Sequence, residues 1–68
     1  MRFLVTVEKD KGNDAFHFIE HQFDTEAVFV RTKQGSDFYE LILADDSQKT
    51  ELTDMLDETE YIIQYEPA

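Results

Sequence analysis

Two histidines and a glutamate are the first side chains whose spacing could do chemistry. The segment His17-Phe18-Ile19-Glu20-His21 has the H-x-x-E-H spacing of inverted zinc peptidases. On a helix, His17 and His21 would lie one turn apart and could share a metal ion, with Asp24 nearby, whereas on a strand they would stand about 13 Å apart. The chain has no third histidine and no cysteine, and 68 residues are too few for a peptidase scaffold. We therefore favour a solvated polar helix face, and we predict no metal site and no cofactor.

A row of carboxylates in the second half of the chain is the other group with informative spacing. On a helix, carboxylates at i, i+3 and i+4 stand about 5–6 Å apart, close to the roughly 6–7 Å between successive phosphates of a nucleic-acid strand. Such a row, with only Lys49 nearby, destabilises an isolated helix, so folding does not require it. It is either a solubilising surface or an imitation of a phosphate backbone that occupies the basic groove of a nucleic-acid-binding protein. The candidate partner-binding residues are Asp45, Asp46, Glu51, Asp54, Asp57, Glu58 and Glu60.

Motifs for catalysis are missing from the sequence. It contains no phosphate-binding glycine loop, no dinucleotide fingerprint, no nucleophile elbow and no cysteine nucleophile. A pair of carboxylates becomes an acid–base site only inside a cleft that shifts one pKa, and a domain this small seldom forms such a cleft. We predict that the protein is not an enzyme.

The charge of the chain is strongly negative and unevenly distributed. Sixteen acidic and six basic residues give a net charge of −10. Residues 1–34 hold five basic and six acidic side chains, a net charge of −1, and residues 35–68 hold one basic and ten acidic side chains, a net charge of −9. This field repels nucleic acid and anionic membranes and attracts basic surfaces. We therefore expect a protein partner, no direct nucleic-acid binding and no membrane association. No apolar run approaches the ~20 residues of a membrane span, and a cytoplasmic location is expected.

Hydrophobic periodicity divides the chain into four strands and two helices. Residues 14–24 decide the topology: as a helix they place Phe16, Ile19 and Phe23 on one face, and as a strand they would add a fifth strand to the sheet. We favour the helix, capped by Asn13 or Asp14. The strands are predicted at residues 2–8, 26–33, 37–44 and 60–66, and a second helix, capped by Asp46 or Ser47, runs to about residue 58. The predicted core is Phe3, Val5, Val7, Phe16, Ile19, Phe23, Val28, Val30, Leu41, Leu43, Leu52, Met55, Leu56, Ile62 and Ile63.

The resulting order, β-α-β-β-α-β, is that of a ferredoxin-like α+β fold. It predicts one domain over residues 1–68, with a single-layer antiparallel sheet and two helices on one face. The alternative, if residues 14–24 form a strand, is a five-stranded sheet with one helix. The open face of the sheet must be solvated or covered by a partner, and a homodimer through this face is one expectation.

Two resemblances suggest functions. In size and charge the chain resembles the small acidic inhibitors that phages direct against host nucleic-acid enzymes, including anti-restriction, anti-CRISPR and uracil-glycosylase inhibitor proteins. This resemblance implies an inhibitor that acts as a DNA or RNA mimic, which is our leading hypothesis. The turn Asp10-Lys11-Gly12 and the order of elements are also similar to ACT-type regulatory modules, which implies a dimer that binds a small effector at the first strand-to-helix turn. The chain departs from that family where Asn13 and Asp14 follow Gly12 in place of apolar residues.

Overall fold

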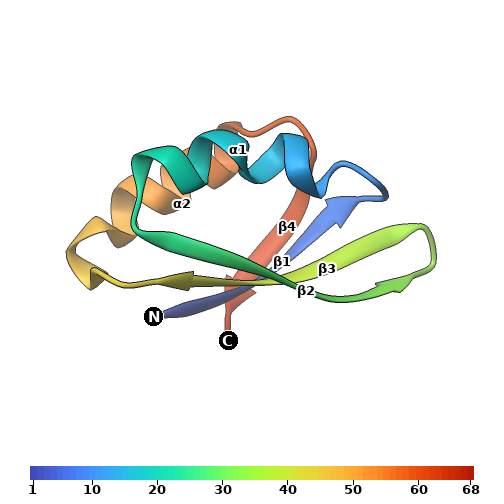
Figure 1. Ribbon diagram of the computed structural model, residues 1–68, viewed down its shortest axis with the longest axis horizontal. Coiled ribbons are helices and arrows are strands. Elements are labelled where there is room, and N and C mark those ends of the chain that lie inside the picture. The colour runs from blue at the N-terminus through green and yellow to red at the C-terminus, as the bar shows by residue number, and fades with distance from the viewer.

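The chain folds into four strands and two α-helices, which follow one another in the order predicted from the sequence. The computed structural model describes residues 1–68. Its four strands form one antiparallel sheet in the order β2-β3-β1-β4, and both helices lie on the same side of it (Figure 1). The ferredoxin-like α+β fold is thus confirmed, and the five-stranded alternative is not formed because residues 14–22 are helical. The elements are β1 (Arg2–Glu8), α1 (Gly12–Gln22), β2 (Thr25–Lys33), β3 (Ser36–Leu43), a short 3-10 turn η1 (Asp46–Gln48), α2 (Lys49–Glu58) and β4 (Ile62–Pro67).

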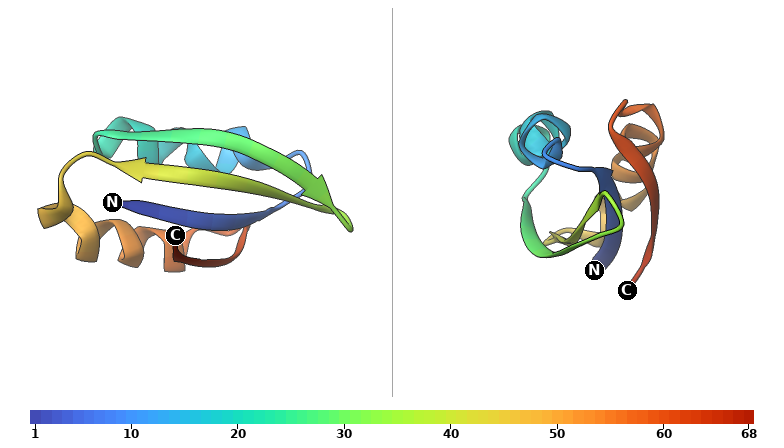
Figure 2. Two further views of the ribbon diagram at one scale, coloured as in Figure 1. Left: turned by 90° about the horizontal axis from the view of Figure 1, so that it is seen from below. Right: turned by 90° about the vertical axis from the view of Figure 1, so that its right-hand side faces the viewer.

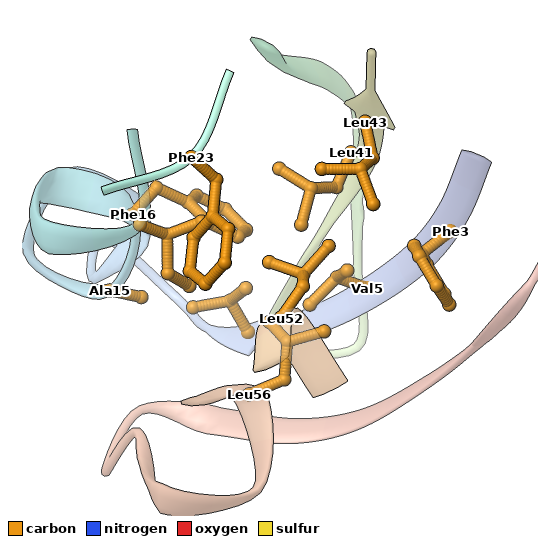
Figure 3. Packing of buried hydrophobic residues seen from close by; sticks show 11 residues of the cluster. Phe3, Val5, Ala15, Phe16, Phe23, Leu41, Leu43, Leu52 and Leu56 are labelled. Atoms are coloured by element: carbon orange, nitrogen blue, oxygen red, sulfur yellow. The ribbon is translucent and has the colours of Figure 1, made fainter. Parts of the chain in front are cut away.

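The core lies in one layer between the sheet and the two helices (Figure 3). Strands β1 and β3 are central in the sheet, and they place Phe3 opposite Leu41. Leu52 of α2 is fully buried against this layer. Eleven buried hydrophobic residues make the cluster: Phe3, Val5, Val7, Ala15, Phe16, Ile19, Phe23, Leu41, Leu43, Leu52 and Leu56.

The two helices cover different halves of the sheet. Helix α1 lies over the β2 side and α2 over the β4 side (Figure 2). As a result, the outer edge of β2 and the outward face of α2 lie on opposite sides of the molecule. Neither helix is both long and apolar enough to cross a membrane.

Three predicted core residues are exposed, and two of them stand at irregularities in strand pairing. Val30 is the extra residue where the β2–β3 register shifts between Phe29 and Arg31. Ile63 is the extra residue where the β1–β4 register shifts, because Val7 faces Ile62 and Thr6 faces Gln64. The bulge in β4 reverses the alternation of side chains and turns Ile63 outward, whereas Val30 lies two residues after Val28 and would share its open face without a bulge. The exposed fractions of Val28, Val30 and Ile63 are 42%, 49% and 56%; Val28 keeps regular pairing but lies on the open face of the sheet.

The predicted caps were also wrong. Helix α1 begins at Gly12, ahead of Asn13 and Asp14, and has no side-chain cap. The residue that caps η1 is Asp45, whose carboxylate accepts hydrogen bonds from the backbone nitrogen of Ser47 at 3.0 Å and from its hydroxyl at 2.7 Å. These bonds lower the pKa of Asp45, because they stabilise the charged form.

Asp37 connects the β2–β3 hairpin to the turn between β1 and α1. Its carboxylate accepts a hydrogen bond from the Thr32 hydroxyl at 2.6 Å and another from the Asp10 backbone nitrogen at 3.0 Å. The second bond holds Asp10 at a positive φ of 66°. The hydrogen bond from Thr32, that from Asp10 and the nearby charge of Lys9 lower the pKa of Asp37, against an opposing effect of burial.

This lowered pKa predicts a pH-dependent contribution of Asp37 to stability. A carboxyl whose folded pKa lies below its unfolded value, about 3.9, stabilises the fold above that value and loses the contribution as the pH falls through the folded pKa. We expect Asp37→Asn to melt at a lower temperature than wild type near neutral pH, with a gap in melting temperature that narrows as the pH falls through the folded pKa. Thermal melts across this range measure the gap. A gap that stays constant with pH would show that ionisation of Asp37 does not matter.

Candidate partner-binding surface

Helix α2 turns one face to the core and the other to solvent. Leu52 and Leu56 are buried with exposed fractions of 0% and 1%. Glu51, Asp54 and Glu58 are exposed, and their spacing places them on neighbouring turns of the outward face. We call these three residues the acidic row. The structure thus agrees with the prediction that these side chains point away from the core, and their role in partner binding stays a prediction.

Three of the other predicted partner-binding residues have partners within the chain. Asp45 caps η1, as described above. The carboxylate of Asp46 lies 3.3 Å from the amino terminus. Asp57 accepts a hydrogen bond of 2.8 Å from the Tyr65 hydroxyl. Glu60 follows α2 in the turn to β4 and is exposed.

The Tyr65–Asp57 contact fastens the C-terminal end of α2 to β4. The ring of Tyr65 packs edge-on against Phe3, with 6.3 Å between centroids, and its hydroxyl reaches Asp57 on the helix. The pKa of Tyr65 is raised, first by the hydrogen bond to Asp57, then by burial and by the negative charges of Asp57 and Asp54. Asp57 therefore has a partner within the chain, and its hydrogen bond links α2 to β4 next to the acidic row.

The acidic row has no positive counterpart in the chain. The two ion pairs of the protein join Asp46 to the amino terminus and Arg2 to Glu40, so neither contains a carboxylate of the row. The last turn of α2 contains no basic residue, although a helix C-terminus favours cations. The row thus offers three carboxylates to the positive groups of another molecule.

The two histidines of α1 lie side by side on an exposed surface. The rings of His17 and His21 meet edge to face with 4.8 Å between their centroids. A shallow hollow there is lined by Asn13, His17, Glu20 and His21. No group of three or more histidine, aspartate or glutamate side chains in the protein is placed to hold a metal ion. A pair of imidazoles alone gives an incomplete coordination shell.

The turn between β1 and α1, where an ACT-type module would bind its effector, is occupied by the chain's own side chains. The ring of Tyr39 lies directly over Gly12. The ammonium of Lys11 stands 5.2 Å from the centre of the Tyr61 ring. Neither of the two surface hollows of the molecule includes Asp10 or Gly12. This arrangement leaves little room for a small ligand at the turn.

The sequence analysis missed the exposed apolar edge of the sheet. Val28, Phe29 and Val30 are 42%, 53% and 49% exposed on β2, the outermost strand on its side of the sheet. A signal for this position exists in the sequence, because the strand ends in Arg31-Thr32-Lys33, and charged residues, lysine especially, are typical of edge strands.

Comparisons of the chain with protein-family models, with curated proteins and with solved structures find no match. Any functional inference for this chain therefore depends on its own residues and their geometry.

Proposed function

We propose that the protein is a protein-binding module that presents the acidic row of α2 to the basic groove of a nucleic-acid-binding protein. By occupying that groove as a phosphate backbone would, it inhibits nucleic-acid binding by its partner. The observation that carries the proposal is the exposure of Glu51, Asp54 and Glu58 on one face of a single helix with no positive side chain paired to them.

The acidic row is unfavourable for the stability of α2. Asp54 and Glu58, four residues apart, repel each other by a few tenths of a kcal/mol. Glu58 also stands at the helix C-terminus, where a negative charge interacts unfavourably with the helix dipole by about 0.3–1 kcal/mol. A lysine at position 58 would instead attract Asp54 and interact favourably with the helix dipole, so it would favour folding. The presence of a destabilising carboxylate supports a role in binding.

The rigid placement of the row supports the same role. Helix α2 is anchored to the core by Leu52 and Leu56 and to β4 by the Tyr65–Asp57 hydrogen bond. Its carboxylates therefore stand on a fixed element, and a rigid binding surface loses less conformational entropy on association than a flexible one. The net charge of −10 also attracts a basic partner over long range and accelerates encounter.

The test compares capture of partner proteins by the wild type and by a charge-reversed variant. The variant carries Glu51→Lys, Asp54→Lys and Glu58→Lys, and each protein is immobilised and exposed to lysate of the source cell at low salt. We expect wild type to capture a basic protein that elutes with rising salt and with added duplex DNA, and the variant to bind it at least about tenfold more weakly. A lysine at position 51, in the first turn of α2, interacts unfavourably with the helix dipole, and a lysine at position 58, in the last turn, interacts favourably with it. Because the two effects oppose each other, the variant should remain folded.

A matched control separates the acidic row from net charge. The control carries Glu8→Lys, Glu20→Lys and Glu66→Lys, three exposed carboxylates outside α2, and thus has the same net charge as the test variant. We expect it to keep most of the wild-type affinity, with a moderate loss from weaker long-range attraction. Equal losses in the two variants, or binding that resists both high salt and the reversal of the row, would refute the proposal.

A further inference from the structure

Strand β2 presents an unpaired edge with unusual apolar exposure. It is nine residues long (Thr25–Lys33) and pairs with β3 on one side only. Val28, Phe29 and Val30 are exposed in its centre. A long edge strand with exposed apolar side chains is a template for pairing with another strand, because its outward backbone groups lack partners.

We propose that β2 pairs antiparallel with β2 of a second copy of the chain, which joins the two four-stranded sheets into one continuous sheet. A two-fold axis through such a pair passes near Val28. The charge pattern and the apolar pattern of β2 are both self-complementary about this point.

The charges of β2 match when the strand is paired with itself. Glu26 faces Ile42 of β3 and Arg31 faces Phe38, and since these two β3 residues are four apart, Glu26 and Arg31 lie on the same face of the sheet. Val30 has no partner in β3 because it is the extra residue of the bulge. If Val30 also stays unpaired between the two copies, Glu26 of each copy stands opposite Arg31 of the other. The ends also match, because Lys33 of each copy comes opposite Asp24 of the other.

The apolar residues match in the same register. Val28 of one copy meets Val28 of the other on the open face. On the helix face, Ala27 of each copy meets Phe29 of the other, which would cover the 53% exposed Phe29 side chain. Thus a single register buries the exposed centre of β2 between two pairs of opposite charges, and it explains an edge that a monomer leaves uncovered.

Strand β2 itself is not acidic, so it adds no net negative charge at the proposed interface. Strand β2 contains one acidic and two basic residues, in a protein with a net charge of −10. Helix α2, which carries the acidic row, lies on the opposite side of each protomer from β2 (Figure 2). The dimer therefore keeps its two acidic rows far apart and exposed.

The test uses two single variants, Glu26→Arg and Arg31→Glu. The pair of positions 26 and 31 occurs twice in the dimer. In a dimer of either variant alone, both of these pairs bring together two side chains of the same charge. In a mixed dimer, the introduced arginine of one variant stands opposite the introduced glutamate of the other, and the native Glu26 stands opposite the native Arg31. Like charges directly opposite each other on neighbouring strands destabilise strand pairing, whereas opposite charges stabilise it. We expect each variant to dimerise at least about tenfold more weakly than wild type and the equimolar mixture to recover dimerisation.

Sedimentation equilibrium from micromolar to millimolar protein measures these states. Wild type should shift from 8.0 kDa toward twice this mass, each variant alone should stay near the monomer mass, and the mixture should shift as wild type does. A wild type that stays monomeric throughout, or a mixture that stays monomeric where wild type dimerises, overturns the proposal.

Leu4→Lys distinguishes edge pairing from a dimer through the open face of the sheet. Leu4 lies in the middle of that face between Glu40 and Glu66 of the neighbouring strands, where a lysine finds opposite charges. It is remote from the outer edge of β2, so dimerisation should be unchanged. If Leu4→Lys abolishes dimerisation, the open face is the interface and the edge pairing is wrong.

Discussion

Leu52→Ala is expected to lower the free energy of unfolding by about 2–5 kcal/mol. Leu52 is fully buried and projects from α2 into the centre of the core, beside Val5 (Figure 3). Removing most of its side chain leaves a cavity that the sheet and α1 cannot fill without moving. A domain of this length has a total stability of only about 3–10 kcal/mol. We therefore expect the variant to be largely unfolded at physiological temperature or close to it.

Urea unfolding followed by circular dichroism measures this loss. Leu52→Met, which nearly conserves volume, serves as the control and should lose less than about 1.5 kcal/mol. Met55 is partly buried on the same helix, so the loss of unfolding free energy in Met55→Ala should lie between the losses in Leu52→Met and Leu52→Ala. If Leu52→Ala were no less stable than Leu52→Met, α2 would not be fastened to the core through this side chain, and the fixed position of the acidic row would lose its explanation.

Gly12→Ala is expected to destabilise the protein by about 1–3 kcal/mol, the usual effect of overpacking. In an unobstructed helix the same substitution stabilises by up to about 1 kcal/mol, so the sign of the effect is diagnostic. A Cβ atom at Gly12 would overlap the hydroxyl and ring of Tyr39. That ring is held edge-on between Phe16, at 4.9 Å, and Phe29, at 5.5 Å between centroids, and it cannot move without disturbing them.

A double-mutant cycle isolates this contact. Tyr39→Leu removes the ring, so Gly12→Ala should cost much less in the Tyr39→Leu background than in wild type. Gly35→Ala is an informative comparison: Gly35 has no neighbour that a Cβ would meet, and only its φ of +80° makes alanine unfavourable. Stabilisation by Gly12→Ala in the wild-type background would show that Tyr39 yields easily and that the turn has room for a ligand.

The sequence predicted the order and type of the four strands and the two α-helices, though not the turn η1, because its periodicity is local. Phe16, Ile19 and Phe23 form one face only at helical spacing, which decided the single ambiguous segment in favour of α1. Strand β3 has apolar residues on both faces, which is a local signal typical of a central strand. The acidic row was also predictable, since the spacing of Leu52 and Leu56 fixes the inward face of α2 and therefore its outward one.

Only the tertiary structure decided where the alternation of inward and outward side chains breaks. It also decided which carboxylates form hydrogen bonds or ion pairs within the chain. Ile63 follows the alternation of the inward-facing Tyr65, but a bulge turns it outward, and the register of β2 with β3 places Val28, and with it Val30, away from the core; both features depend on how a strand pairs with a neighbour distant in the chain. The position of β2 at an edge likewise follows from the pairing of β1 with β3 and β4. Among the predicted carboxylates, Asp57 is tied to Tyr65 eight residues away, while Glu51, Asp54 and Glu58 remain free. Periodicity along a chain determines which side of a helix or strand faces inward; contacts between distant segments determine which of the outward groups are left for another molecule.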